Sequence, residues 1–192
     1  ESCAAISRPK GVMKKPDKHC RPTILFPLRQ STVHTSPVRL AIPEDIEGWL
    51  ALAKEVEHLF GPMAEVPEFK DALAKVIADK QAFASPRGSS PLANSILGGI
   101  VVSKETNSIE WLVVSASARG LGIGGQLLEA ALNRLDSARP IAVQTFAPSV
   151  PEGLAARRLY QKFGFEDREN MGLNPAGIDT VLMVKSPCSQ VG

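Results

Sequence analysis

One segment constrains the fold of this 192-residue chain more than any other, because it places a run of glycines between two apolar stretches. Residues 109–114 have the composition of a strand, and residues 119–125 read Arg-Gly-Leu-Gly-Ile-Gly-Gly. Residues 122–137 then carry apolar side chains at helical spacing. The sequence therefore predicts a strand, a glycine-rich turn and a helix in direct succession.

The start of such a helix is a binding site for an anion. The N–H groups of its first turn have no partner within the helix and lie at the positive end of its dipole. Glycines lack a Cβ, so a phosphate can approach the backbone closely, and Arg119 can add a charged contact or hold the turn. A purely structural turn is the alternative, but the strand before it and the helix after it favour phosphate binding.

The glycine spacing also fits a dinucleotide site. Gly120, Gly122 and Gly125 match the pattern G-x-G-x-x-G. Such a site needs an acidic residue at the end of the next strand to bind ribose, whereas the predicted strand 141–146 ends in Gln-Thr-Phe. The chain also lacks repeated strand–helix–strand units. An NAD(P)-dependent oxidoreductase is therefore the less favoured alternative.

The remaining pattern predicts a mixed sheet covered by helices. Three adjacent strands in the middle of the chain favour antiparallel pairing, and the strand–helix–strand unit around the glycines favours a parallel pair. The fold class is α/β (α+β), with one sheet of six to seven strands and about four helices. Strands are predicted at 38–42, 81–85, 95–104, 108–114, 141–146, 165–170 and 179–184, and helices at 43–60, 68–79, 122–137 and 152–163.

Charge divides the chain into parts. Residues 1–39 hold eight Lys or Arg and two acidic residues, whereas the rest holds fourteen basic and eighteen acidic residues. We expect an irregular basic extension over 1–36, one domain over 37–186 and a short tail over 187–192. Because the domain is mildly acidic and only 5% of the chain is aromatic, we expect no nucleic-acid partner.

Other classes of protein find no support in the composition. No apolar run reaches the roughly 18 residues of a membrane helix, so we expect no membrane partner. Cys3, Cys20 and Cys188 form no disulfide pattern, and no histidine lies near a cysteine pair. We therefore expect reduced thiols, no metal, a cytoplasmic location, and a monomer or homodimer.

Two motifs together resemble one family. Read as Arg-x-x-Gly-x-Gly, residues 119, 122 and 124 resemble the acetyl-CoA pyrophosphate loop of GCN5-related N-acetyltransferases (GNAT). After the next predicted strand, residues 156–165 read Ala-Arg-Arg-Leu-Tyr-Gln-Lys-Phe-Gly-Phe and resemble the family's A-x-x-L-Y-x-x-x-G-F signature. The resemblance covers residues 38–185 and is strongest over 109–165.

The resemblance implies a sheet that splays between its fourth and fifth strands and takes the cofactor into the gap. Backbone groups of Leu112, Val113 and Val114 would pair with the pantetheine, with a β-bulge near Val113–Val114 freeing them. Gly153 departs from the family, since many relatives have Asn at that place. The expected cofactor contacts are completed by Arg119, Gly120, Leu121, Gly122, Ile123, Gly124, Gly125, Gly153 and Ala156.

The resemblance also implies catalytic roles. Tyr160, the only tyrosine, matches the general acid that protonates the departing thiolate, although it could instead pack under the cofactor. Glu110 is the candidate base for the amine, because alternation would place it on one strand face with Leu112 and Val114; an ordinary solvated glutamate is the alternative. The N–H of Val114 would stabilise the oxyanion.

The function implied is transfer of an acetyl group from acetyl-CoA to a primary amine of a small molecule or peptide, by direct attack in a ternary complex. The acceptor stays open, because the acidic residues of the first helix are typical of a solvated face: Glu44, Asp45, Glu47, Glu55 and Glu57. A longer acyl-CoA donor also stays open. A non-catalytic acyl-CoA-binding module is the main alternative.

Overall fold

The computed structural model describes residues 37–88 and 95–187, all within a single unit of the chain. The expected basic extension over 1–36 and residues 188–192 of the expected tail lie outside the described residues. Cys3, Cys20 and Cys188 lie outside them too. No described helix is both long and apolar enough to cross a membrane.

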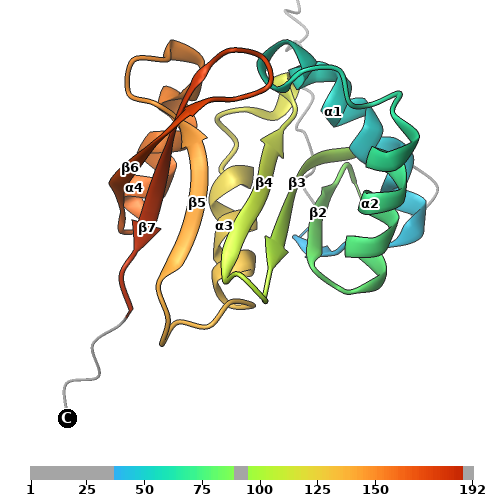
Figure 1. Cartoon of the computed structure of the whole chain (residues 1–192). Coiled ribbons are helices and arrows are strands. Elements are labelled where there is room, and N and C mark those ends of the chain that lie inside the picture. Colours follow the sequence, from blue (N-terminus) through green and yellow to red (C-terminus); the bar gives the residue numbers. More distant parts are fainter. Residues whose placement is uncertain (1–36, 89–94, 188–192) are drawn as a thin grey trace, which may run out of the picture. The chain divides into compact units, whose positions relative to one another are not determined.

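A single seven-stranded sheet organises the described residues, with the strand order β1-β2-β3-β4-β5-β7-β6 (Figure 1). The pair β4 and β5 is parallel, and the other neighbouring pairs are antiparallel. A mixed sheet is confirmed, and it differs from the parallel sheet of dinucleotide-binding folds. The strands are Arg39–Leu40 (β1), Ala82–Pro86 (β2), Ile96–Ser103 (β3), Ser108–Val114 (β4), Ile141–Phe146 (β5), Phe165–Leu173 (β6) and Asp179–Lys185 (β7).

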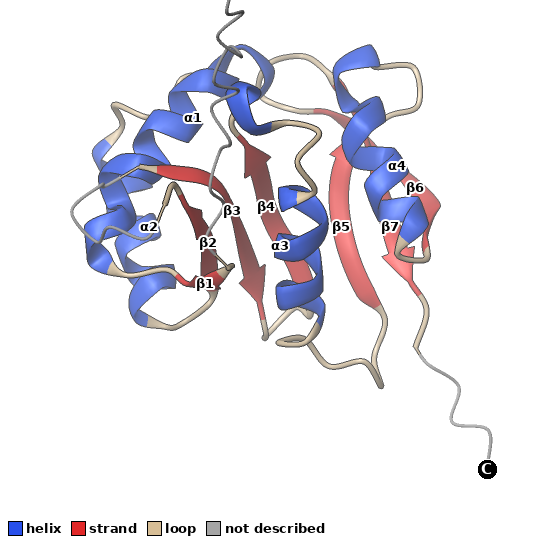
Figure 2. Cartoon of the chain, turned by 180° about the vertical axis from the view of Figure 1, so that it is seen from behind, coloured by secondary structure: helices blue, strands red, loops and turns tan. Residues whose placement is uncertain are grey.

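Within the described ranges, four α-helices cover the two faces of the sheet. They are α1 (Ile46–Phe60), α2 (Pro67–Ala78), α3 (Ile123–Leu132) and α4 (Leu154–Lys162). The helices α1 and α2 lie on one face, and α3 and α4 lie on the other (Figure 2). Each face has its own apolar core: Trp49, Leu52 and Val56 belong to the first, and Leu127 and Leu128 to the second.

Two adjacent glycines in β3 let helices approach the sheet closely from both faces. A Cβ at Gly99 would lie 2.3 Å from Cη2 of Trp49, which is fully buried. A Cβ at Gly98 would lie 3.1 Å from Cδ1 of Leu127 and 3.2 Å from Cγ2 of Ile123. Since successive residues of a strand point to opposite faces, Gly98 admits α3 and Gly99 admits α1.

The helix α3 ends at Leu132, so the prediction that it extends to residue 137 is wrong at that end. Buried Asn107, in the β3–β4 turn, donates from Nδ2 to the carbonyls of Asp136 (3.0 Å) and Pro140 (2.9 Å). Its Oδ1 accepts the N–H of Asp136 at 2.9 Å. These bonds hold the segment after Leu132 in an irregular path, although Leu135 continues the apolar pattern and is buried.

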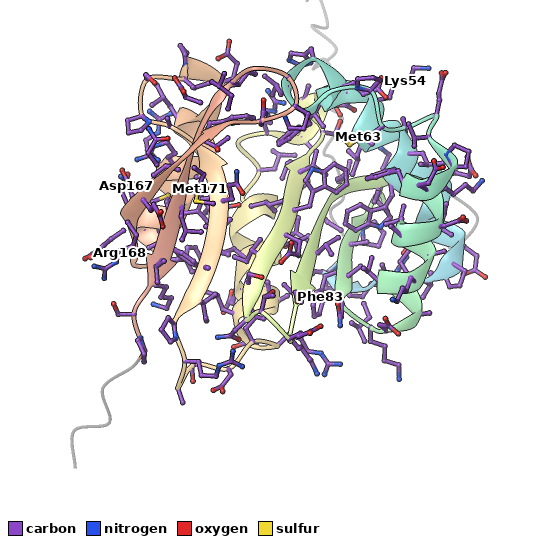
Figure 3. All side chains as sticks on the ribbon, viewed as in Figure 1. Lys54, Met63, Phe83, Asp167, Arg168 and Met171 are labelled. Atoms are coloured by element: carbon purple, nitrogen blue, oxygen red, sulfur yellow. The ribbon has the colours of Figure 1, made fainter. Side chains whose placement is uncertain are left out.

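The strand β6 forms one edge of the sheet, and most of its residues are exposed. Asp167, Arg168 and Met171 lie on this strand (Figure 3). The carboxylate of Asp167 accepts two hydrogen bonds from Arg157 of α4, at 2.7 and 3.0 Å, and the side chain of Arg157 is only 5% exposed. This ion pair attaches α4 to the edge strand.

Candidate active site

The strand β4 contains one more residue than the stretch of β3 beside it. Trp111 pairs with Val101 and Ile109 pairs with Val102, so Glu110 has no partner and forms a β-bulge. The parallel pairing of β4 with β5 is limited to Ser108–Ala142 and Ile109–Val143, and the two strands part at the bulge. The expected splay is confirmed. The bulge lies at Glu110, however, and not near Val113–Val114, because the extra residue comes directly after the last pair with β5.

The bulge interrupts the alternation along β4. Ile109, Leu112 and Val114 all pack against the core beneath α3 and α4, although Ile109 and Leu112 are three residues apart. Trp111 and Val113 belong to the opposite core. The prediction that simple alternation places Glu110 with Leu112 and Val114 is therefore wrong. Glu110 is exposed, and its carboxylate accepts hydrogen bonds from the hydroxyls of Ser108 and Thr106.

Beyond Ile109, one edge of β4 faces the gap. The N–H of Ser115 donates to the carbonyl of Leu97 in the β3 direction at 2.8 Å. Since alternate residues of a strand direct their amides to opposite edges, the amides of Leu112 and Val114 point the other way, toward β5. No register pair joins these described residues to β5. Their N–H and C=O groups are therefore available to a bound chain.

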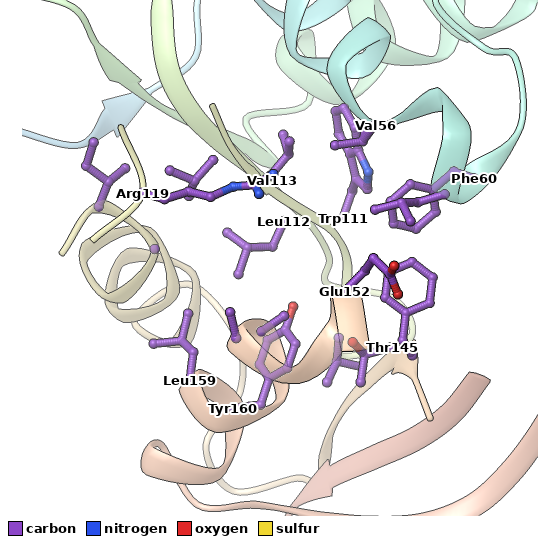
Figure 4. Close-up of a pocket in the computed structure, with 18 of the residues that line it drawn as sticks. Val56, Phe60, Trp111, Leu112, Val113, Arg119, Thr145, Glu152, Leu159 and Tyr160 are labelled. Atoms are coloured by element: carbon purple, nitrogen blue, oxygen red, sulfur yellow. The ribbon is translucent and has the colours of Figure 1, made fainter. Parts of the chain in front are cut away.

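A cavity of about 670 Å³ opens at this gap (Figure 4). The structure brings together at its walls twelve of the fourteen residues expected to form the site: Glu110, Leu112, Val113, Val114, Arg119, Gly120, Gly122, Ile123, Gly124, Gly125, Ala156 and Tyr160. Leu121 and Gly153 do not line it. The Leu121 side chain is 47% exposed and stands outside the cavity.

The glycine-rich turn has the geometry of an anion site. Gly120 and Gly122 both have a φ of +80°, a conformation that side chains rarely adopt. Gly122 caps α3 without any side-chain hydrogen bond, so no side chain occupies the first N–H groups of the helix. A Cβ at Gly122 or Gly125 would meet nothing within 4 Å, which leaves open space before the helix. Ile123 is 1% exposed, so it can offer a ligand only its backbone.

Gly153 has a packing role. A Cβ there would lie 2.5 Å from Cβ of Phe146, and Gly153 is buried outside the cavity. Its φ of −81° is one that any residue adopts, so the requirement for glycine comes from Phe146 and not from the backbone. Gly153 thus packs against Phe146 and does not line the cavity. An asparagine, as in many GNAT relatives, would not fit in this position.

Tyr160 lies on α4 beside the gap. Its ring packs edge-on against Phe165 at 5.6 Å between centroids, and the residue is 3% exposed. Figure 4 shows its hydroxyl directed into the cavity. Burial raises the pKa of the Tyr160 phenol, because the charged phenolate is disfavoured away from water. The group is therefore neutral and holds a proton that it can donate.

Several acidic residues of the first helical segment accept hydrogen bonds within the protein. Glu55 accepts hydrogen bonds from the Ser115 hydroxyl (2.9 Å) and the Ala116 N–H (2.8 Å), just before the glycine-rich turn. Glu57 accepts the N–H groups of Met63 and Ala64, and these bonds lower its pKa. Asp45 is buried and pairs with Arg39 at 2.7 Å. The solvated-face interpretation is therefore wrong for Asp45, whereas Glu55 is exposed and Glu57 is half-exposed, and hydrogen bonds hold both carboxylates.

Sequence reasoning missed one wall of the cavity. Five apolar residues share it: Val56, Leu59 and Phe60 of α1, Trp111 of β4, and Phe146 of β5. The ring centroids of Phe60 and Phe146 are 5.2 Å apart, and Trp111 stacks on Trp49 at 5.5 Å. No motif marks these residues, because they come from three separate segments. Glu152 and Asn174, which also line the cavity, were missed as well.

No group of three or more His, Cys, Asp or Glu within residues 37–88 and 95–187 is placed to hold a metal ion. The titratable side chains that line the cavity are Glu110, Arg119, Glu152 and Tyr160. Proton transfer and charge stabilisation are the chemistry that these groups can supply.

Comparison with known proteins shows which family and which folds this chain resembles. Residues 88–167 match the family model described as an acetyltransferase (GNAT) domain. Similar solved structures include an N-acetyltransferase from Staphylococcus aureus Mu50, at 20% identity and a TM-score of 0.62, with 79% of this chain and 98% of that chain covered. Another is Arabidopsis thaliana Naa50, determined with a bisubstrate analogue, at 22% identity and a TM-score of 0.57, with 79% and 98% covered. A search of curated proteins finds no match.

The splayed sheet and the glycine-rich turn at the cavity thus belong to a fold that this chain shares with solved acetyltransferase structures. Residues 88–167 match a GNAT acetyltransferase domain model, and the described residues share the fold of solved acetyltransferases, so the resemblance expected from the two motifs is confirmed.

Proposed function

We propose that this chain transfers an acetyl group from acetyl-CoA to a primary amine within a ternary complex. The observation that carries the proposal is the parting of β4 and β5 after Ile109, which opens a cavity between the glycine-rich turn and the apolar wall. A donor bound at the turn and an acceptor at the wall would meet at the gap. The structure of A. thaliana Naa50 with CoA-Ac-MVNAL supports this arrangement, because that ligand joins CoA to a peptide.

The donor would bind mainly to backbone. The N–H groups that begin α3 receive the pyrophosphate. Arg119, the only basic side chain among the described residues that line the cavity, adds a charge-assisted contact. The unpaired amides of Leu112 and Val114 extend the sheet by pairing with the pantetheine. Ala156 borders the pantetheine on the α4 side.

The reaction would then need few groups. The neutral amine attacks the thioester carbonyl, and the N–H of Val114 stabilises the oxyanion that forms. The C–S bond breaks, and the thiolate takes the proton of Tyr160. The amine loses its own proton to Glu110, directly or through water. The network of Thr106 and Ser108 holds the Glu110 carboxylate beside the gap.

The decisive experiment compares turnover of the wild type with that of Tyr160→Phe. This change removes the hydroxyl and keeps the ring against Phe165. We expect kcat to fall by about 100-fold, within the usual range for general acids, and the KM for acetyl-CoA to stay within about twofold. An unchanged kcat would exclude Tyr160 as the acid. Binding of acetyl-CoA without turnover of any amine would instead indicate a non-catalytic acyl-CoA-binding module.

A further inference from the structure

The wall of the cavity opposite the glycine-rich turn differs sharply in character from the turn itself. The turn offers backbone N–H groups and Arg119, whereas the wall consists of Val56, Leu59, Phe60, Trp111 and Phe146. Leu59, Phe60 and Trp111 are half-buried, so they present apolar surface to the cavity. An apolar surface of this kind binds a ligand by removing apolar area from water.

The two ends lie on opposite sides of the sheet. Leu112 and Val114 pack with the core under α3 and α4, while Val56 belongs to the core under α1 and α2, against which Phe60 and Trp111 pack. The cavity therefore passes through the gap between β4 and β5. A donor held at α3 fills one side, so the apolar wall on the α1 side is left for the acceptor.

The wall is held rigidly. Trp111 stacks on Trp49 and meets Phe69 edge-on at 5.9 Å, and Phe60 packs against Phe146. Asn174, in the β6–β7 loop, donates from Nδ2 to the carbonyl of Leu59 at 2.7 Å. A preformed apolar surface discriminates between ligands better than a mobile one, because less order is lost on binding.

The cavity carries little charge with which to recognise a polycation. Within the part of the chain that the structure describes, Glu110 and Glu152 are the only acidic residues that line it, and both are exposed. Glu110 would act as the base, and Glu152 would pair with the same amine while it is still charged. This arrangement suits an acceptor with a single amine, because no carboxylate is left for a second ammonium. A polyamine or an aminoglycoside would leave further ammonium groups facing the apolar wall, at a cost in desolvation.

We infer that the acceptor is a monoamine whose amine-bearing carbon carries an aliphatic or aromatic group, and that this group binds against Phe60, Trp111 and Leu59. The inference rests on the proposed acetyl transfer and adds the acceptor class to it. Two sources share this chemistry: a free apolar amine, and a peptide whose first residue has an apolar side chain.

The test is a panel of acceptors at saturating acetyl-CoA, with release of free CoA and the mass of the product as readouts. One arm compares phenethylamine and isoamylamine with ethanolamine and spermidine. The other compares peptides that differ only in the first residue, with Met or Leu against Ser or Asp. We expect kcat/KM to be at least about tenfold higher for the apolar members, the size of effect that an apolar pocket gives. The arm with the higher values identifies the source.

A pair of variants then locates the preference. Phe60→Ala removes an aromatic ring from the wall and should lower kcat/KM for the apolar acceptor by about tenfold, with the KM for acetyl-CoA unchanged. Phe83→Ala is the matched control, since Phe83 is a half-buried phenylalanine on β2 that does not line the cavity. It should change neither constant by more than about twofold.

Failure of the inference and failure of the proposed function give different results. Equal or faster transfer to ethanolamine, spermidine or the Ser and Asp peptides overturns the inference and leaves acetyl transfer standing. An equal loss in Phe60→Ala and Phe83→Ala also overturns it. Absence of transfer to every amine, with acetyl-CoA bound, overturns the proposed function and the inference together.

Discussion

The side-chain amide of Asn174 donates to the main-chain carbonyl of Leu59 at 2.7 Å and so joins the β6–β7 loop to the last turn of α1. The same side chain accepts the N–H groups of Ala176 and Ile178 through Oδ1, at 3.0 and 2.9 Å. One residue thus orders its own loop and holds the end of the helix that carries Phe60.

This hydrogen bond predicts that a change at Asn174 weakens binding of the acceptor amine and leaves binding of acetyl-CoA intact. Asn174→Asp keeps the Oδ1 acceptor for the loop but replaces the donor to Leu59 with a carboxylate oxygen. We expect the KM for the amine to rise by roughly threefold to tenfold, the loss of about one hydrogen bond, with the KM for acetyl-CoA unchanged. Asn170→Asp is the control, because Asn170 accepts the Gly172 N–H at 2.7 Å on the same hairpin, away from the cavity. Equal effects of the two changes would contradict this role.

The glycine-rich turn predicts a loss of donor binding from one substitution. Gly122→Asp places bulk and negative charge where the pyrophosphate would lie, so we expect the affinity for CoA to fall by more than about 100-fold. Gly177→Asp is the matched control. Gly177 has a φ of +77° and Gly122 has a φ of +80°, and a Cβ at either position would meet no atom within 4 Å. Both should lose similar stability, roughly 1 kcal/mol. Calorimetric titration with CoA separates them, and equal affinities would refute the placement of the pyrophosphate.

Replacement by alanine should lower the free energy of unfolding at Gly153 but not at Gly125. In Gly153→Ala the new Cβ meets Phe146 at 2.5 Å, so we expect the free energy of unfolding to fall by about 1–3 kcal/mol. In Gly125→Ala the new Cβ meets nothing within 4 Å inside α3, so the free energy should stay constant or rise by up to about 1 kcal/mol. Denaturant unfolding without ligand measures both. A stable Gly153→Ala protein would remove the packing explanation.

The raised pKa of Tyr160 predicts how the protein behaves in alkali. Because Tyr160 is the only tyrosine, the phenolate absorbance of the chain reports this one group. The folded protein should show no phenolate up to about pH 10, the usual pKa of tyrosine. A raised folded pKa means stability that is present below the unfolded pKa and is lost as the pH rises above it. The absorbance should therefore rise together with unfolding, and a separate titration in the folded protein below pH 10 would contradict burial of the phenol.

Local patterns predicted the elements around the donor site well. The bounds of β4 and β5 agree with the prediction, and the turn at 119–125 has the expected place between strand and helix. These features depend on neighbouring residues, so the chain reveals them directly. The end of α3 was not predictable in this way, since the apolar spacing continues to Leu135 and only Asn107, from a distant turn, reshapes the segment.

The apolar wall of the cavity, in contrast, could not be predicted from local patterns. Val56, Trp111 and Phe146 come from three segments, and each fits an ordinary core position of its own helix or strand. Only the spatial arrangement reveals that they face a common cavity. The position of the bulge was predicted wrongly for a related reason. An extra residue in β4 can be recognised only when β4 is aligned with β3, and the sequence of β4 does not give that register.

Because Glu110 is an extra residue without a partner in β3, the opening of the sheet depends on the number of residues in β4. Replacement of side chains around the gap can alter which molecules react there. The extra residue between Ile109 and Trp111 stays in place, and with it the point where β4 and β5 part. Substrate preference can thus drift during evolution by single substitutions on α1 and the β6–β7 loop without loss of the donor site. A one-residue deletion at position 110 would instead restore the register of β4 with β3 and remove the bulge, so we expect the gap to be more sensitive to shortening at this position than to exchange of the side chain.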